Sequence, residues 1–128
     1  MPKKILLIEN DDEMRELMRT TLKQNGYEVA TAADGVNGYD KALFMRPDVI
    51  VTSIGLPGAD GIHVVRRVRD TPSLAETPIV VTTPFGTGKA TFSLQLGANA
   101  FEPIPIDPRS LLITVRRLLK SRKARKAA

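Results

Sequence analysis

The sequence predicts an α/β protein, a doubly wound sheet of five parallel strands combined with five helices. Segments 5–8, 48–53 and 78–83 are nearly continuous apolar runs rich in β-branched residues, which is typical of strands buried on both faces of a parallel sheet. Between these runs, apolar residues recur at helical spacing. Because parallel strands are joined through crossover connections, this alternation of patterns indicates the fold class.

The first half of the chain supplies three strands and two helices. Strand 5–8 precedes a helix that ends at the stop signal Asn25-Gly26. A weaker strand pattern at 28–31, a helix over 36–45 and strand 48–53 follow. The apolar stripe of the first helix consists of Met14, Leu17, Met18 and Thr21.

The second half of the chain repeats the alternation. A helix with a stripe at Ile62, Val65 and Val68 precedes strand 78–83, and a helix over 88–96 and a weak strand over 98–101 follow. In the last helix, Asp107 is the predicted N-cap and Pro108 the first helical residue. Its apolar positions are Leu111, Leu112, Val115, Leu118 and Leu119.

The composition is that of one ordinary globular domain, which we place at residues 1–120. The 128 residues are 42% hydrophobic and include no cysteine, which excludes thiol catalysis and Cys-based zinc sites. His63 is the single histidine, so an all-protein zinc site is not expected. No apolar run approaches the roughly 20 residues that span a bilayer. We therefore expect a cytoplasmic protein.

The net charge of +5 is concentrated near the C-terminus, in a basic tail that we place at residues 121–128. Seven basic residues lie between Arg116 and Lys126, and the remainder has 12 basic and 14 acidic residues. The tail could be a solvated helix end, a contact for an acidic protein, or a contact for nucleic acid or anionic lipid. The absence of aromatic residues from Lys120 to Lys126 favours the solvated end over a nucleic-acid contact.

Several strand ends and loops resemble bacterial response-regulator receiver domains. The resemblance extends from about Lys3 to Leu119, and the loop Leu56-Pro-Gly-Ala-Asp-Gly61 together with the Pro-Asp start of a strand is its most specific part. It implies a flavodoxin-like fold with strand order 2-1-3-4-5. The segments that carry it are Ile5–Arg15, Ala32–Gly35, Arg46–Ser53, Leu56–Gly61, Thr77–Thr83 and Gly97–Phe101.

The family resemblance implies phosphoryl transfer onto an aspartate, assisted by Mg²⁺, but several positions depart from that pattern. Ser53 falls where the phosphoacceptor aspartate belongs, and Glu9 and Asn10 fall where the metal-binding acid pair belongs. Thr83 retains the hydroxyl that contacts a phosphoryl oxygen. Ile104 falls where the family has its lysine.

Two further positions follow from the resemblance. Phe101 falls at the family's switch aromatic, although a lone aromatic in a final strand is more often packed against its neighbours. Pro105 retains the proline after the family's lysine position, and we expect a cis peptide bond between Ile104 and Pro105.

These departures predict a pseudo-receiver without catalytic residues or a cofactor. A hydroxyl is a poor nucleophile without an activating base, and Glu9 is the nearest candidate base. Mg²⁺ would retain mainly Glu9 and a backbone carbonyl, which we assign to Gly55, so we expect Mg²⁺ binding to be absent or weak. The acids from Glu9 to Asp12 are interpreted as helix caps in preference to a residual metal site.

The predicted function is that of a stand-alone signalling adaptor in a two-component phosphorelay, which is not an enzyme and acts by protein–protein contact. In the family, the output surface comprises the fourth helix, fifth strand and fifth helix, here Thr87–Leu96, Ala98–Glu102 and Pro108–Leu118. One alternative is a small α/β enzyme or ligand-binding domain that uses the crevice at the strand ends. Another is a receiver regulated by phosphorylation of Ser53 by a serine kinase.

Overall fold

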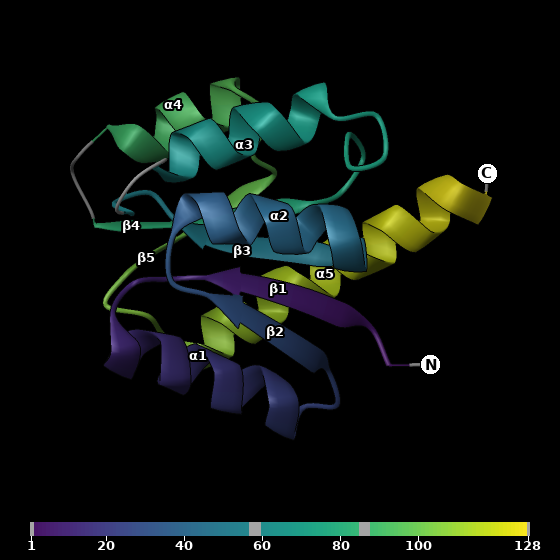
Figure 1. Cartoon of the computed structure of the whole chain (residues 1–128). Helices are drawn as coiled ribbons and strands as arrows, with labels where there is room; N and C mark the ends of the chain where they lie inside the picture. Colours follow the sequence, from purple (N-terminus) through teal and green to yellow (C-terminus); the bar gives the residue numbers. More distant parts are fainter. Residues whose placement is uncertain (1, 57–59, 85–87, 128) are drawn as a thin grey trace.

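Five parallel strands form one sheet in the order β2-β1-β3-β4-β5, with the two weakest predicted strands at its edges (Figure 1). The computed structural model describes residues 2–56, 60–84 and 88–127. The predicted fold class and strand order are confirmed. The strands are β1 (Lys4–Ile8), β2 (Glu28–Ala32), β3 (Val49–Ser53), β4 (Ile79–Pro84) and β5 (Ala100–Ile104).

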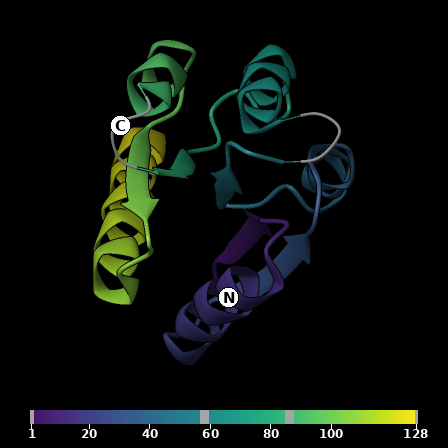
Figure 2. The same cartoon turned by 90° about the vertical axis from the view of Figure 1, so that its left-hand side faces the viewer.

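Helices cover both faces of the sheet, as two-sided burial of the strands requires. Helices α2, α3 and α4 lie on one face, and α1 and α5 lie on the other (Figures 1 and 2). The five helices are α1 (Asp12–Gln24), α2 (Gly35–Met45), α3 (Gly61–Asp70), α4 (Lys89–Gln95) and α5 (Pro108–Ala127).

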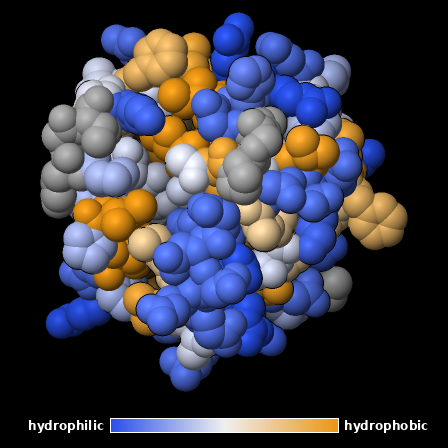
Figure 3. Space-filling view, turned by 60° about the vertical axis from the view of Figure 1, so that its left-hand side comes forward, coloured by the Kyte–Doolittle hydropathy of each residue, from blue (hydrophilic) through white to orange (hydrophobic). Residues whose placement is uncertain are grey.

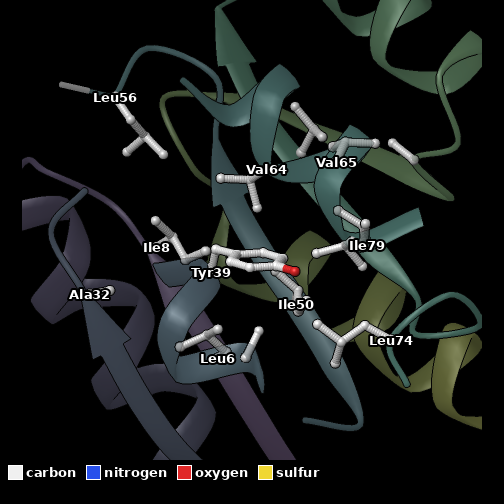
Figure 4. Packing of buried hydrophobic residues seen from close by; sticks show 14 of the residues in the cluster. Leu6, Ile8, Ala32, Tyr39, Ile50, Leu56, Val64, Val65, Leu74 and Ile79 are labelled. Carbon is white, nitrogen blue, oxygen red and sulfur yellow. The ribbon is translucent and has the colours of Figure 1, made fainter. Parts of the chain in front are cut away.

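Alternate strand residues divide the interior into two cores. On the α2–α3 face, the Tyr39 ring packs among Leu6, Ile8 and Ile50 (Figure 4). On the other face, side chains of β1 and β3 pack against Met18 of α1. Because successive side chains of a strand point to opposite faces, both cores together fix the strand register.

Three helices begin with the same local interaction. Asp11, Asp34 and Asp60 are the N-caps of α1, α2 and α3, and each side chain accepts a hydrogen bond from the backbone N–H three residues later. These bonds satisfy N–H groups that have no partner inside the helix. The capping interpretation of Asp11 is therefore confirmed.

The fifth strand differs from its predicted position of 98–101. It spans Ala100–Ile104, because the preceding residues complete the end of α4: the backbone N–H of Ala98 donates to Ser93, and Gly97 has a φ of 118°. The backbone N–H of Asn99 then donates to Ile79 and starts the pairing with β4. The expected cis peptide bond between Ile104 and Pro105 is present.

Helix α5 continues through residue 127, so most of the predicted tail is helical. The predicted start is confirmed, since Pro108 is the first helical residue and the Asp107 carboxylate accepts from the backbone N–H of Arg109 at 3.0 Å. The Arg122 guanidinium donates to the backbone carbonyls of Pro47 and Asp48. The segment beyond residue 120 therefore contacts the two residues that precede β3.

Within the described ranges, no helix combines the length and apolar character that a membrane crossing requires.

Arg69 joins three separate parts of the chain at the end of α3. Its guanidinium donates to the carbonyls of Gly97, Ala75 and Thr77 and to the side-chain oxygen of Asn99 at 2.7–3.1 Å. The bonds connect α3 to the start of β4 and to the turn before β5. Removing Arg69 would leave several partly buried carbonyl groups without this donor.

We predict that Arg69→Ala lowers the free energy of unfolding by about 3 kcal/mol, because it removes several charge-assisted hydrogen bonds at once. Urea unfolding measures the change. Arg66→Ala is the matched control, since Arg66 lies one turn earlier on α3 and is exposed; its effect should stay within about 0.5 kcal/mol. Equal stability losses in the two variants would contradict this role of Arg69.

Candidate functional site

The candidate site lies where the parallel strands end, at the edge of the sheet toward which Figure 3 looks. Glu9 directly follows β1, Ser53 is the last residue of β3, Thr83 lies near the end of β4, and Ile104 ends β5. The sheet therefore brings the predicted site residues to one edge. Apolar and polar side chains alternate in patches on this face of the molecule (Figure 3).

Glu9 is a buried carboxylate held by the start of α1. Its side chain is 3% exposed, and its Oε2 accepts from the backbone N–H of Asp11 at 3.0 Å. Its Oε1 is buried without a hydrogen-bond partner among the described residues. Burial raises the pKa of Glu9, while hydrogen bonds from the backbone N–H groups of Asp11 and Asn10 partly offset this effect.

Asn10 lies between two oxygen acceptors. With its side-chain nitrogen turned toward them, the amide donates to Glu9 Oε2 at 3.1 Å and to the backbone oxygen of Gly55 at 3.3 Å. A carboxylate and a carbonyl oxygen are ligands that Mg²⁺ accepts, whereas an amide N–H is a donor. The Asn10 amide can thus satisfy both oxygens without a cation.

Ser53 is held in close contact with the start of α3. Its side chain is buried, and its backbone oxygen accepts from the Thr52 hydroxyl at 3.1 Å. A Cβ on Gly61 would lie 2.0 Å from that backbone oxygen, so only glycine fits at the first position of α3. The close approach of Gly61 at the start of α3 thereby holds the backbone of Ser53 in place at the end of β3.

A row of polar side chains continues from Ser53 across the sheet and was not predicted from the sequence. In the strand register Ser53 pairs with Thr82, and Thr82 pairs with Glu102. Thr82 and Glu102 are both buried, and Glu102 Oε2 accepts a hydrogen bond from the Thr114 hydroxyl of α5 at 2.8 Å. The sequence signal that could have revealed this row is the presence of polar residues, Thr82 and Glu102, within two strands of the predicted sheet. The partner of Glu102 on α5, Thr114, could not be identified from the local sequence pattern.

The remaining predicted positions occupy the end of β4 and β5. Thr83 is buried and pairs with Pro103, while Ile104 pairs with Pro84 and is half-buried. Phe101 is 39% exposed, so the expectation that its ring is simply packed against neighbours is only partly met. It lies on β5 beside the surface of α5.

The remaining acidic and histidine side chains near this edge are dispersed or paired among the described residues. The described part of the chain contains no group of three or more His, Cys, Asp or Glu side chains placed to hold a metal. Asp12 forms an ion pair with Arg15, and His63 is exposed beside Asp60 on α3. Residues 57–59 of the predicted Leu56–Gly61 loop, and Thr87, lie outside the described residues.

Comparisons with known proteins identify relatives along almost the whole chain. A family model for the response regulator receiver domain matches residues 5–116. Response regulator MprA of a Mycobacterium species is 36% identical over 121 residues, which cover 94% of this chain and 52% of that protein. Transcriptional regulatory protein AfsQ1 of Streptomyces coelicolor is 37% identical over 91% of this chain and 51% of its own length. The chain thus spans about half the length of these curated relatives.

Solved structures of similar size share the same architecture. A putative response regulator from Chloroflexus aurantiacus superposes with a TM-score of 0.90 at 30% identity, covering 94% of this chain and 99% of that one. Chemotaxis response regulator CheY4 of Vibrio cholerae has a TM-score of 0.86 at 31% identity, covering 92% and 99% of the two chains.

The buried Glu9 predicts a specific pH dependence of stability. Because folding raises the pKa of Glu9, the folded state holds this proton more tightly than the unfolded state. The contribution of Glu9 to the free energy of unfolding is therefore largest at low pH and declines as pH rises from the ordinary carboxyl range through the raised pKa. Glu9→Gln should lack this decline.

Urea unfolding of both proteins at a series of pH values measures the difference. The stability of Glu9→Gln relative to the unmodified protein should increase with pH and then level off above the raised pKa. A pH-independent difference, or a relative gain by the unmodified protein as pH rises, would contradict the buried, poorly solvated environment of Glu9.

Proposed function

The chain belongs to the response regulator receiver domain family of two-component systems, and on this basis we propose that it is a pseudo-receiver that signals by protein–protein contact without aspartyl phosphorylation. The single observation that carries the proposal is Ser53. It ends the central strand β3 at the carboxyl edge of the sheet, and the family resemblance puts the phosphoacceptor aspartate at this position. The proposed role is cytoplasmic and non-enzymatic.

The surroundings of Ser53 do not favour its activation as a nucleophile. A serine hydroxyl attacks phosphorus only when a base removes its proton. Glu9 is the candidate base at the strand ends; its Oε2 already accepts from Asp11 and can also accept from Asn10, which leaves only the buried Oε1 to take a proton. The burial of Ser53 also disfavours the alternative in which a serine kinase modifies it.

The donor set does not fit the divalent cation that the family implies. Two positions that would supply carboxylates hold Asn10 and Ser53, which leaves Glu9 and the backbone oxygen of Gly55. Since Mg²⁺ demands octahedral oxygen ligation and usually one or two carboxylates, we propose that it binds weakly or not at all. The Asn10 amide supports this view, because its N–H groups can donate hydrogen bonds to Glu9 Oε2 and to the backbone oxygen of Gly55.

Ile104 is consistent with a site that no longer binds a phosphoryl group. The family's lysine would pair with a phosphoryl oxygen, and without an anion nearby it would be a partly buried, unpaired charge. An apolar, half-buried side chain at the end of β5 avoids this penalty. The changes at Asn10, Ser53 and Ile104 therefore form one coherent set.

The proposed output is a protein contact through α4, β5 and α5. Half of the large hydrophobic side chains that are exposed in the described residues lie on these elements, namely Phe92, Leu94, Phe101 and Ile113. A small enzyme or ligand-binding domain would instead need convergent polar groups at the crevice, where Pro103, Ile104 and Pro105 are apolar.

Restoring the missing groups tests the proposal. The unmodified chain should form no phosphoryl adduct with acetyl phosphate and Mg²⁺ in an intact-mass measurement. The triple variant Asn10→Asp, Ser53→Asp, Ile104→Lys should bind Mg²⁺ and take up one phosphate, because Glu9 and Thr83 are already in place. Ser53→Asp alone should recover little, since groups that act as a unit are strongly non-additive.

Matched controls separate folding from chemistry. Each variant is first checked for a cooperative unfolding transition, and the triple variant with Ser53→Asn in place of Ser53→Asp should bind no phosphate. An adduct on the unmodified chain would overturn the pseudo-receiver proposal. A folded triple variant that neither binds Mg²⁺ nor accepts phosphate would show that the assigned positions are wrong.

A further inference from the structure

Phe44, near the end of α2, is the most exposed large apolar residue of the described chain. It is 94% exposed, whereas the other large hydrophobic residues at the surface are 39–63% exposed. Lys41 precedes Phe44 by three residues, which makes the two neighbours on the helix surface, and the Lys41 ammonium donates to the backbone oxygen of Thr31 in β2. The Phe44 ring therefore protrudes from the outer surface of α2 on the side of β2.

A cavity of about 260 Å³ lies beside Phe44, between the end of α2 and the start of β2. These two ends lie on the same side of the molecule (Figure 1). A cavity of about 150 Å³ can hold a benzene molecule, so this one has room for a phenylalanine ring. Met45, the residue after Phe44, lines it, so the protruding ring and the cavity are adjacent. The lining residues are Lys4, Glu28, Val29, Ala30 and Met45.

The cavity follows an open edge of the sheet. Strand β2 is the first strand in the sheet order, so its outer side has no neighbouring strand among the described residues. Lys41 covers the carbonyl of Thr31 near the end of this strand, whereas residues 28–30, at its start, line the cavity. Because an open strand edge is a surface on which another chain readily packs, the start of β2 and the cavity together form a candidate contact.

The ring and the cavity are each accompanied by one acid and one base. Asp40 and Lys41 precede Phe44 by four and three residues. Glu28 and Lys4 line the cavity. The ion pairs of the described ranges lie within α1 and at the start of α3, so none involves these four side chains. Nucleic acid and anionic lipid are disfavoured as occupants, because the two carboxylates would face their phosphates.

This face is complementary to itself. A two-fold contact brings the same surface of two subunits together, so a feature on one subunit meets its adjacent feature on the other. Here the Phe44 ring of each copy meets the cavity of the other, and the two contacts form at once. The charges also match, because Asp40 beside the ring approaches a cavity that contains Lys4, and Lys41 approaches one that contains Glu28.

We propose that two copies of the chain associate through the end of α2 and the start of β2, with Phe44 of each copy in the cavity beside Met45 of the other. An interface centred on one ring per subunit is smaller than those of stable dimers, so the dissociation constant should be about 10–100 µM. The strand-end residues take no part in this contact, which is therefore independent of the chemistry at Ser53.

Sedimentation of the full chain from about 5 µM to 1 mM measures the association. The average mass should rise from that of the monomer toward that of the dimer. Phe44→Ala should raise the dissociation constant at least about tenfold and leave the free energy of unfolding unchanged, because the ring is exposed in the monomer. Phe92→Ala is the matched control, since Phe92 is an exposed phenylalanine of α4; it should change the dissociation constant less than about twofold.

A mixture of two variants tests whether the ring and the cavity are reciprocal. Ala30→Phe fills the cavity with a ring of the same chain and should weaken self-association as Phe44→Ala does. When the two variants are mixed, one of the two ring–cavity contacts can form, so the mixture should associate more tightly than either variant alone. Both variants are first checked for a cooperative unfolding transition, and Ala30→Leu replaces Ala30→Phe if the larger side chain prevents folding.

NMR spectra of the ¹⁵N-labelled full chain locate the contact. On dilution through the dissociation constant, the backbone signals of Glu28, Val29, Ala30 and Met45 should shift, because these residues line the cavity. The signals of α4 and α5 should stay in place.

Several results would overturn the inference. These are a chain that stays monomeric at about 1 mM, equal weakening by Phe44→Ala and Phe92→Ala, and a mixture that associates no more tightly than its components. Dilution shifts confined to α4 and α5 would assign self-association to another surface. Binding of the monomer to vesicles rich in phosphatidylserine, if Phe44→Ala abolished it, would assign the face to a membrane surface instead.

Discussion

The two-sided burial of the central strands is the constraint on which the rest of the structure depends. In β1, β3 and β4 the apolar side chains alternate between the two cores, and those of Ile5–Ile8, Val49–Val51 and Ile79–Val81 are 0% exposed. Burial of each such side chain contributes about 1.5–3 kcal/mol. A slip of one residue would exchange the side chains of the two cores, so the register is strongly specified. The residues that end these strands are therefore neighbours whatever their chemistry.

This separation of fold from site explains how the chain can keep a receiver architecture with altered chemistry. The helix caps, the two cores and the close contact of Gly61 with Ser53 do not require an aspartate at position 53. At the site, the Asn10 amide can bond both Glu9 and Gly55, each bond contributing about 0.5–1.5 kcal/mol net. The proposed pseudo-receiver thus needs no cation to satisfy Glu9 Oε2 and the backbone oxygen of Gly55.

Much of the fold was predictable because its signals are local. Continuous β-branched runs identified β1, β3 and β4, and Asp107 followed by Pro108 identified the start of α5. The limits of β5 were not predictable, because Ala98 has strand-like neighbours but bonds to the end of α4. Contacts distant in sequence were also missed: Arg122 donates to a carbonyl 74 residues away, and Glu102 accepts from Thr114 on the next helix. At the site, sequence resemblance indicated the positions, whereas the placement of the Asn10 amide between two acceptors required the structure.

The most direct test of the central claim observes the Asn10 side chain itself. In NMR spectra of the ¹⁵N-labelled full chain, Asn10→Asp identifies the side-chain NH₂ signals of Asn10 by their loss. If this amide bonds Glu9 and Gly55 in place of a cation, its protons should exchange slowly with water and its signals should not move on addition of Mg²⁺. Rapid exchange, together with signals at Asn10 and Gly55 that shift and saturate as Mg²⁺ is added, would contradict the account.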